Sequence, residues 1–224
     1  MPHALAGFLT HKNHPLRTAL IDEMHVRRFP AFTAPMRMTQ LVMYTGEQQV
    51  SEARSHAEAL CARYNVVPPK GKYFSMSLGE LHLVWEHHTE FSTYSFIKKG
   101  ATDDPFASPV LLELPHDWVE SLPGQVLRAT QVALTARSQP EPSDELLASS
   151  FSAADLMSCE VQNSEARIWS DFKLHEDGMG RLLIRDQTLH GGGDTARLVQ
   201  RLQELGNYRN MALLGLPMAQ SLTP

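Results

Sequence analysis

The chain has 224 residues, of which 42% are apolar and 20% charged, and its formal net charge at pH 7 is −5. These values are typical of a globular protein, and the acidic balance argues against a nucleic-acid partner because no basic excess exists to displace phosphate counterions. The two cysteines, Cys61 and Cys159, exclude a disulfide framework and a cysteine-rich zinc site, and they suit a reducing compartment. The N-terminus lacks a secretion signal, and the longest apolar run, 211–219, is far shorter than the ~20 residues that span a bilayer. The chain alone is therefore expected to be soluble.

The first half predicts two helices and four strands. A helix is expected over 15–28, where Pro15 suits the first turn, and an amphipathic helix over 49–64, where apolar residues recur at helical spacing. Segments rich in β-branched and aromatic residues predict strands over 39–45, 72–78, 80–87 and 90–98.

The second half predicts a strand over 125–136, then three strands that form a meander, and a final helix over 194–214. The three strands are expected over 156–162, 165–174 and 180–187. Between them, residues 138–152 are acidic and rich in Pro and Ser, which is typical of a surface loop or linker.

Together these elements predict one α+β domain over 1–224, with a minor boundary at 138–152 as the alternative. Its mainly antiparallel sheet of about seven strands would be packed by N-terminal, middle and C-terminal helices. A parallel dinucleotide-binding sheet is not indicated, because no βαβ series is evident.

The segment "WEHHTEFSTYSF", residues 85–96, carries the strongest candidate site. In an extended strand Glu86, His88 and Glu90 share one face, and carboxylate, imidazole and carboxylate can converge on zinc, manganese or iron. One glutamate beside a histidine could also act as a general base. The alternative is the polar tip of a hairpin, since a turn at residues 88–89 would break the alternation. No cofactor other than a divalent metal is indicated.

The first predicted helix carries a second set of charged residues. Glu23 and His25 are two positions apart and so cannot share a helix face, which argues against a simple catalytic dyad. Arg17 and Arg28 could bind an anionic ligand or pair with the strand carboxylates, and the alternative is a solvated basic face.

Three blocks of the sequence resemble a bacterial family of uncharacterised membrane-anchored proteins, a domain of unknown function (DUF3422). They are "HPLRTALIDEMHVRRFPAFTAPMR", "WEHHTEFSTYSF" and "ARLVQRLQELGNYRNMALLGLPMA", in that order. The chain departs from the family pattern at His87, where arginine is expected, and at Val26 and Arg28. It also departs at Gly206 and Asn207 in the last block.

The resemblance implies a soluble N-terminal portion at the cytoplasmic face of the inner membrane, with the membrane anchor in a C-terminal region absent from this chain. It names no activity. By layout alone, a soluble head followed by long helices and a membrane hairpin is similar to CorA-type ion transporters, which suggests a third hypothesis, the regulation of ion passage.

The polar residues in these blocks define a hypothetical cluster. If the first and last helices both pack near the hairpin tip, the cluster could bind a ligand, or it could be a network of paired charges that fixes the helices on the sheet. Its members are His14, Arg17, Glu23, His25, Arg27, Glu90, Arg201 and Tyr208.

The sequence therefore leads to two main hypotheses. The first is a non-enzymatic domain for assembly or ligand sensing at the membrane face, which forms a homo-oligomer or binds a partner through its last helix. The alternative is a metal-dependent enzyme or metal-binding domain that uses the cluster over residues 86–90.

Overall fold

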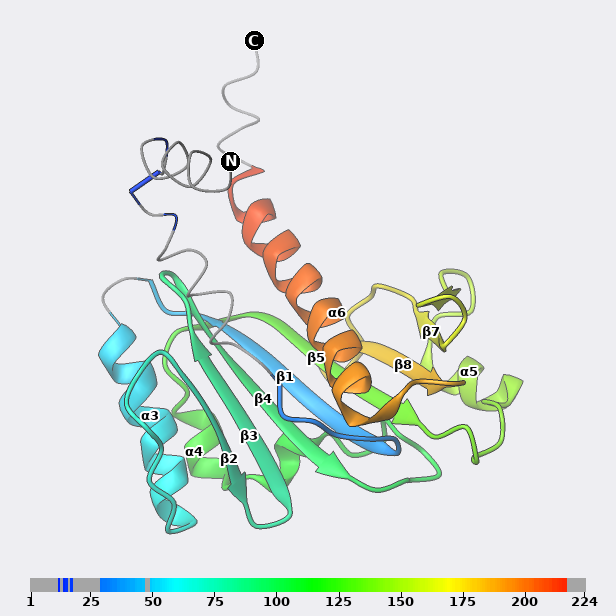
Figure 1. Cartoon of the computed structure of the whole chain (residues 1–224), viewed down its shortest axis with the longest axis horizontal. Coiled ribbons are helices and arrows are strands. Elements are labelled where there is room, and N and C mark those ends of the chain that lie inside the picture. Colours follow the sequence, from blue (N-terminus) through cyan, green and yellow to red (C-terminus); the bar gives the residue numbers. More distant parts are fainter. Residues whose placement is uncertain (1–11, 13, 16, 18–28, 47–48, 217–224) are drawn as a thin grey trace, which may run out of the picture.

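The computed structural model describes residues 12, 14, 15, 17, 29–46 and 49–216, and this part of the chain forms a single eight-stranded sheet with helices packed on it (Figure 1). All neighbouring strands are antiparallel except β5 (Gln125–Thr135) and β8 (Gly180–Asp186), which are parallel. The α+β class and the mainly antiparallel sheet are confirmed, with eight strands where about seven were expected. Across the sheet the order is β2 (Tyr73–Leu78), β3 (Leu81–His87), β4 (Phe91–Lys99), β1 (Met36–Tyr44), β5 (Gln125–Thr135), β8 (Gly180–Asp186), β7 (Ala166–Ser170) and β6 (Met157–Val161).

The described helices differ from the sequence expectation in two places. The last helix begins at Gly191 rather than at residue 194, so the glycines of "HGGGD" lie in its first turn. The segment 138–152 contains a short helix capped by Ser143, whose Oγ accepts a hydrogen bond from the Leu146 amide. The helix expected over 15–28 lies almost wholly outside the described residues. The described helices are α3 (Val50–Arg63), η1 (Val110–Glu113), α4 (His116–Glu120), α5 (Asp144–Ser150) and α6 (Gly191–Leu214).

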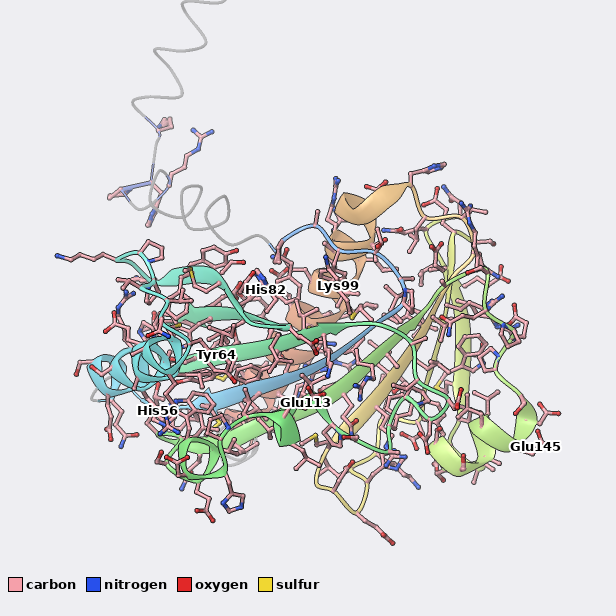
Figure 2. All side chains as sticks on the ribbon, turned by 90° about the horizontal axis from the view of Figure 1, so that it is seen from below. His56, Tyr64, His82, Lys99, Glu113 and Glu145 are labelled. Carbon is pink, nitrogen blue, oxygen red and sulfur yellow. The ribbon has the colours of Figure 1, made fainter. Side chains whose placement is uncertain are left out.

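One face of the sheet is covered by α3, η1 and α4. The sheet supplies alternate residues of each strand, such as Leu41 and Trp85, and α3 supplies the stripe predicted by its helical spacing. Of that stripe Ala57, Leu60 and Cys61 are all fully buried. Figure 2 shows α3 and α5 at opposite ends of the molecule, marked by the labels His56 and Tyr64 for α3 and Glu145 for α5.

The opposite face is covered by the first half of α6. Leu198 and Val199 of this helix pack with strand residues such as Met38, Val132 and Ile184. Figure 1 shows the helix continuing past the ends of the strands. Because α6 is fixed to the sheet along its first half, the sheet determines where its second half projects.

Candidate functional site

A row of side chains crosses the α6 face near one end of the sheet. Directly opposed residues of neighbouring strands point to the same face. Tyr73 of β2 pairs with Glu86 of β3, which pairs with Thr93 of β4. Val42 of β1 lies between Thr93 and Arg128 of β5. The row therefore brings a phenol, a carboxylate, a hydroxyl and a guanidinium to one side of the sheet.

Glu86 lies in this row as a buried carboxylate, only 6% exposed. Its Oε2 lies 3.6 Å from Nε2 of His88 and accepts a long hydrogen bond of 3.5 Å from the Thr93 hydroxyl. Its Oε1 is buried and has no hydrogen-bond partner in the described part of the chain. Burial of such an oxygen opposes folding unless a donor or a cation satisfies it.

Tyr73, beside Glu86, is affected by the same environment. Burial raises the pKa of the Tyr73 phenol, the hydrogen bond with Ser75 lowers it, and the Glu86 charge raises it further. The net shift is upward, which keeps the phenol protonated and able to donate a hydrogen bond at neutral pH.

The hairpin tip separates the three residues predicted to bind a metal. Glu86 and His88 lie on one face, as strand alternation predicts, but Glu90 follows the turn and its side chain is exposed. The Glu90 backbone carbonyl accepts hydrogen bonds from the Thr45 and Gly46 amides. Over the described ranges, no three His, Cys, Asp or Glu side chains are placed to hold a metal ion together.

The last helix reaches the hairpin tip, as the cluster hypothesis required. The Tyr208 ring meets the His88 ring edge-on, with centroids 6.2 Å apart, and the His88 ring also stacks on Phe91 with centroids 4.0 Å apart. His14, Arg17 and Arg201 are described and exposed. The other predicted members, Glu23, His25 and Arg27, lie outside the described residues. The structure therefore brings together Glu86, His88 and Tyr208, whereas Glu90 lies beyond the turn.

Arg128 forms the centre of a polar network that sequence reasoning missed. One nitrogen of its guanidinium, Nη1, donates to the side-chain oxygens of Gln203 at 2.7 Å, Asn207 at 2.9 Å and Gln40 at 3.3 Å. All three acceptors are neutral and at most 5% exposed. Burial without a carboxylate partner lowers the pKa of Arg128 to about 10. The network joins β1 and β5 to the middle of α6 by hydrogen bonds.

Gly206 allows α6 to pass close over Arg128. A Cβ at this position would lie 2.8 Å from both Cζ and Nη2 of the guanidinium. Gly206 and Asn207 are also the two residues at which the last block departs from the family pattern. That departure was the sequence signal for the network, but the signal does not identify Arg128 as the partner.

A second polar cluster fixes the loop after β7. The fully buried Asp171 carboxylate accepts hydrogen bonds from the Ser152 amide at 2.8 Å and the Lys173 amide at 3.2 Å, and lies 3.2 Å from Nε2 of His175. Burial raises the pKa of the Asp171 carboxyl, but the two amide donors and His175 together outweigh it, so the pKa is lowered overall. The loop is therefore held by an ionised carboxylate.

A surface hollow of about 360 Å³ lies at the same end of the sheet as the hairpin tip. Gly124 in its wall has a φ of +90°, and a Cβ there would meet the Tyr44 carbonyl oxygen at 2.4 Å. The close approach of the two chain segments at this point therefore requires glycine. The hollow is lined by Tyr44, Thr45, Gly46, Gln49, Gly124 and Gln125, none of which is acidic or basic.

The second half of α6 carries an exposed apolar surface. Leu205, Tyr208 and Ala212 recur at intervals of three or four residues and so share one side of the helix. Leu205 is 60% exposed and the neighbouring Leu213 is 57% exposed. We call residues 205–216, which are the end of α6 and the two residues that follow it, the distal segment of α6. Several large apolar side chains on one short helical segment are typical of a protein contact surface.

Comparison with known proteins gives one family. The family model described as "Protein of unknown function (DUF3422)" matches residues 12–224. No curated protein matches the chain, and no solved structure matches it. None of the helices in the described ranges is both long enough and apolar enough to cross a bilayer.

Proposed function

The chain belongs to the DUF3422 family of proteins of unknown function, and we propose that it is a non-enzymatic assembly domain that joins copies of itself through the distal segment of α6. The observation that carries this proposal is the exposure of Leu205, Leu213, Leu214 and Leu216, which range from 45% to 60%. Burial of the exposed part of each side chain would stabilise a contact by roughly 1 kcal/mol per residue. A contact of this size is weak, so copies of the chain are expected to associate only at high protein concentration.

The way α6 is anchored supports this role. Its first half is held by apolar packing of Leu198 and Val199, and its middle by hydrogen bonds from Arg128 to Gln203 and Asn207. These contacts fix the direction in which the distal segment leaves the sheet. A surface fixed in this way loses little conformational entropy when it binds, which favours association.

Sedimentation velocity over a range of protein concentrations tests the proposal. The wild-type chain is expected to associate as its concentration rises, and Leu213→Glu is expected to remain monomeric. The matched control is Leu112→Glu, because Leu112 on η1 is also an exposed leucine, with 72% exposure, and lies outside the distal segment. The control should behave like the wild type. A wild type that stays monomeric, or a Leu213→Glu variant that associates as strongly as the wild type, would contradict the proposal.

The proposal extends to location at the cytoplasmic face of the bacterial inner membrane. Its support is the resemblance of the three sequence blocks and the presence of unpaired thiols, Cys61 and Cys159, which suit a reducing compartment. Cys159 is exposed and so can report the location. A membrane-impermeant maleimide should label it only after cells are lysed. Labelling in intact cells would contradict a cytoplasmic location.

Binding of a divalent metal is a second candidate function. The specific observation in its favour is Glu86, a buried carboxylate with an unsatisfied Oε1 and an imidazole nitrogen 3.6 Å from its Oε2. Metal content of tag-free protein, measured by mass spectrometry for the wild type, Glu86→Gln and His88→Ala, tests this function. Near-stoichiometric metal in the wild type that is lost in both folded variants would support it. Absence of metal from the wild type, even after incubation with zinc or manganese, would exclude it.

A further inference from the structure

Arg128 is a cation whose hydrogen-bonding capacity is only partly used. All the hydrogen bonds that it makes to described residues leave from Nη1. Nε and Nη2 donate to no described residue, and both remain accessible to solvent. We infer that this free edge of the guanidinium binds the carboxylate of a small molecule. The inferred site lies under the middle of α6, whereas the proposed contact between copies lies on the distal segment, so the inference goes beyond the proposed function.

The free edge has the shape that recognises an oxyanion. The Nε–H and one Nη2–H of a guanidinium are parallel, and this pair matches the two oxygens of a carboxylate. Gly206 lies over the flat face of the guanidinium, because a Cβ there would be almost equally far from Cζ (2.8 Å), Nη2 (2.8 Å) and Nε (3.0 Å). A Cβ in the plane beyond the edge would instead be closer to the two nitrogens than to Cζ. The helix therefore passes over the cation and leaves its Nε–Nη2 edge open.

Among the described residues, the unmatched polar groups of this network are all donors. Because arginine can only donate, the side-chain oxygens of Gln203 and Asn207 face it and their NH2 groups point elsewhere. The Gln203 Nε2 group is buried and has no acceptor. The Asn207 Nδ2 group donates to no described residue either, whereas the oxygens of both amides are satisfied by Arg128. An added acceptor, and not an added donor or cation, would therefore complete the network.

The charge of Arg128 also lacks a partner in the described part of the chain. Its acceptors are neutral amides, and burial lowers its pKa to about 10. Glu86 lies in the same row, but two strands separate it from Arg128, which puts the two backbones about 14 Å apart. Glu86 instead contacts His88 and Thr93. A monoanion would neutralise the buried cation, whereas a dianion such as phosphate would leave a net negative charge there, so a carboxylate fits best.

The hollow at this end of the sheet offers space for the rest of the ligand. Tyr44 and Gln125 line it and pair across β1 and β5, as Val42 and Arg128 do in the next row on the same face. Because Tyr44 is two residues along the strand from Val42, the wall of the hollow begins roughly 7 Å from the Arg128 row. The lining residues in the described part of the chain carry no charge. The rest of the ligand should therefore be uncharged.

Titration of the whole chain with sodium propionate tests the inference. The Nε–H signals of ¹⁵N-labelled arginine report the binding by NMR, and sodium chloride at equal concentration is the reference. The Arg128 signal, identified by its loss in Arg128→Lys, should shift and saturate with propionate but not with chloride. A signal that responds to propionate no more than to chloride would overturn the inference and leave water as the partner of the free edge.

Asn207→Asp removes the need for an external anion while it keeps Arg128 in place. The new carboxylate would stand where the Asn207 oxygen now accepts from Nη1 at 2.9 Å, so it forms an internal ion pair. The variant should have a raised Tm and bind propionate at least roughly tenfold more weakly than the wild type. Asn210→Asp is the matched control, because it adds the same charge one turn further along α6, and it should bind propionate like the wild type. Undiminished binding by Asn207→Asp would overturn the inference.

Two further probes test the ligand class. 1-Propanol, which lacks the charge, should not shift the Arg128 signal, and a saturable shift would contradict recognition of the carboxylate. Inorganic phosphate at pH 8, where it is mainly a dianion, should bind more weakly than propionate, and tighter binding would contradict the choice of a monoanion. Leu213→Glu, which disrupts the contact between copies, should leave propionate binding unchanged. Failure of the assembly proposal and failure of this inference can therefore be told apart.

Discussion

Replacing Arg128 by methionine removes the charge and the donors of the buried network while keeping a side chain of similar length. The oxygens of Gln203, Asn207 and Gln40 then lose the donor that they share. A buried acceptor left without a partner costs about 1–3 kcal/mol, and the contact to Gln40, at 3.3 Å, is the weakest of the three. Methionine no longer requires the burial of a cation, and this offsets part of the lost stability. We expect the free energy of unfolding to fall by roughly 3 kcal/mol, or about 6–12 °C in Tm for a chain of this size.

Urea unfolding followed by circular dichroism measures this change. The matched control is Arg201→Met, because Arg201 is an exposed arginine on α6, the helix that the Arg128 network holds. The control should lie within about 0.5 kcal/mol of the wild type. Adding Gln203→Leu and Asn207→Leu to Arg128→Met should recover part of the lost stability, because the orphaned acceptors are then removed as well. An Arg128→Met variant as stable as the wild type would refute the role of the network in holding α6.

Two further predictions concern single positions. Alanine in place of glycine usually stabilises a helix by roughly 1 kcal/mol, but Gly206→Ala should give no such gain, because its Cβ would displace the Arg128 guanidinium. Gly193→Ala is the control and should raise the Tm, because nothing lies within 4 Å of its Cβ. An equal rise in Tm for both variants would contradict the close approach of α6 to Arg128. Asp171→Asn should cost about 1–3 kcal/mol at pH 7. Because folding lowers the Asp171 pKa, this stabilisation is fully present above the unfolded value of about 3.9 and disappears as pH falls below it. Urea unfolding at pH 7, 5 and 3 should show the difference between wild type and variant shrinking at pH 3, and a difference that grows in acid would contradict this assignment.

Local patterns in the sequence predicted most of the elements. The alternation and the β-branched content of the strands gave β2, β3 and β4 to within a residue or two, and helical spacing gave α3. Strand alternation and helical spacing both arise because one face of each element is buried. Both patterns can therefore be recognised in a single sequence. The antiparallel meander of β6, β7 and β8 was also predicted, because these strands follow one another directly along the chain.

The long-range features could not be predicted from those patterns. The parallel pairing of β5 with β8 joins strands separated by α5 and the β6–β7 hairpin, and no local signal specifies it. Similarly, nothing local distinguishes Arg128 from the other polar residues of β5, and its role follows only from the position of α6 over it. The first turn of α6 was missed because Gly191, Gly192 and Gly193 have low helix propensity, and packing of the following turns overrides it.

The predicted site residues fall into two groups in the structure. Glu86 and His88, which strand alternation put on one face, lie 3.6 Å apart, and the Tyr208 ring of the last family block meets the His88 ring at the hairpin tip. Glu90 was expected on the same face, but it lies in the turn after β3, where the backbone is no longer extended and strand alternation no longer applies.

The most direct test of the central claim is hydrogen–deuterium exchange of the distal segment of α6 at low and high protein concentration. If this segment joins copies of the chain, the backbone amides of residues 205–214 should exchange more slowly at high concentration, and Leu213→Glu should abolish the difference. Exchange that is independent of concentration in this segment, measured where the chain is associated, would contradict the claim and assign the association to another surface.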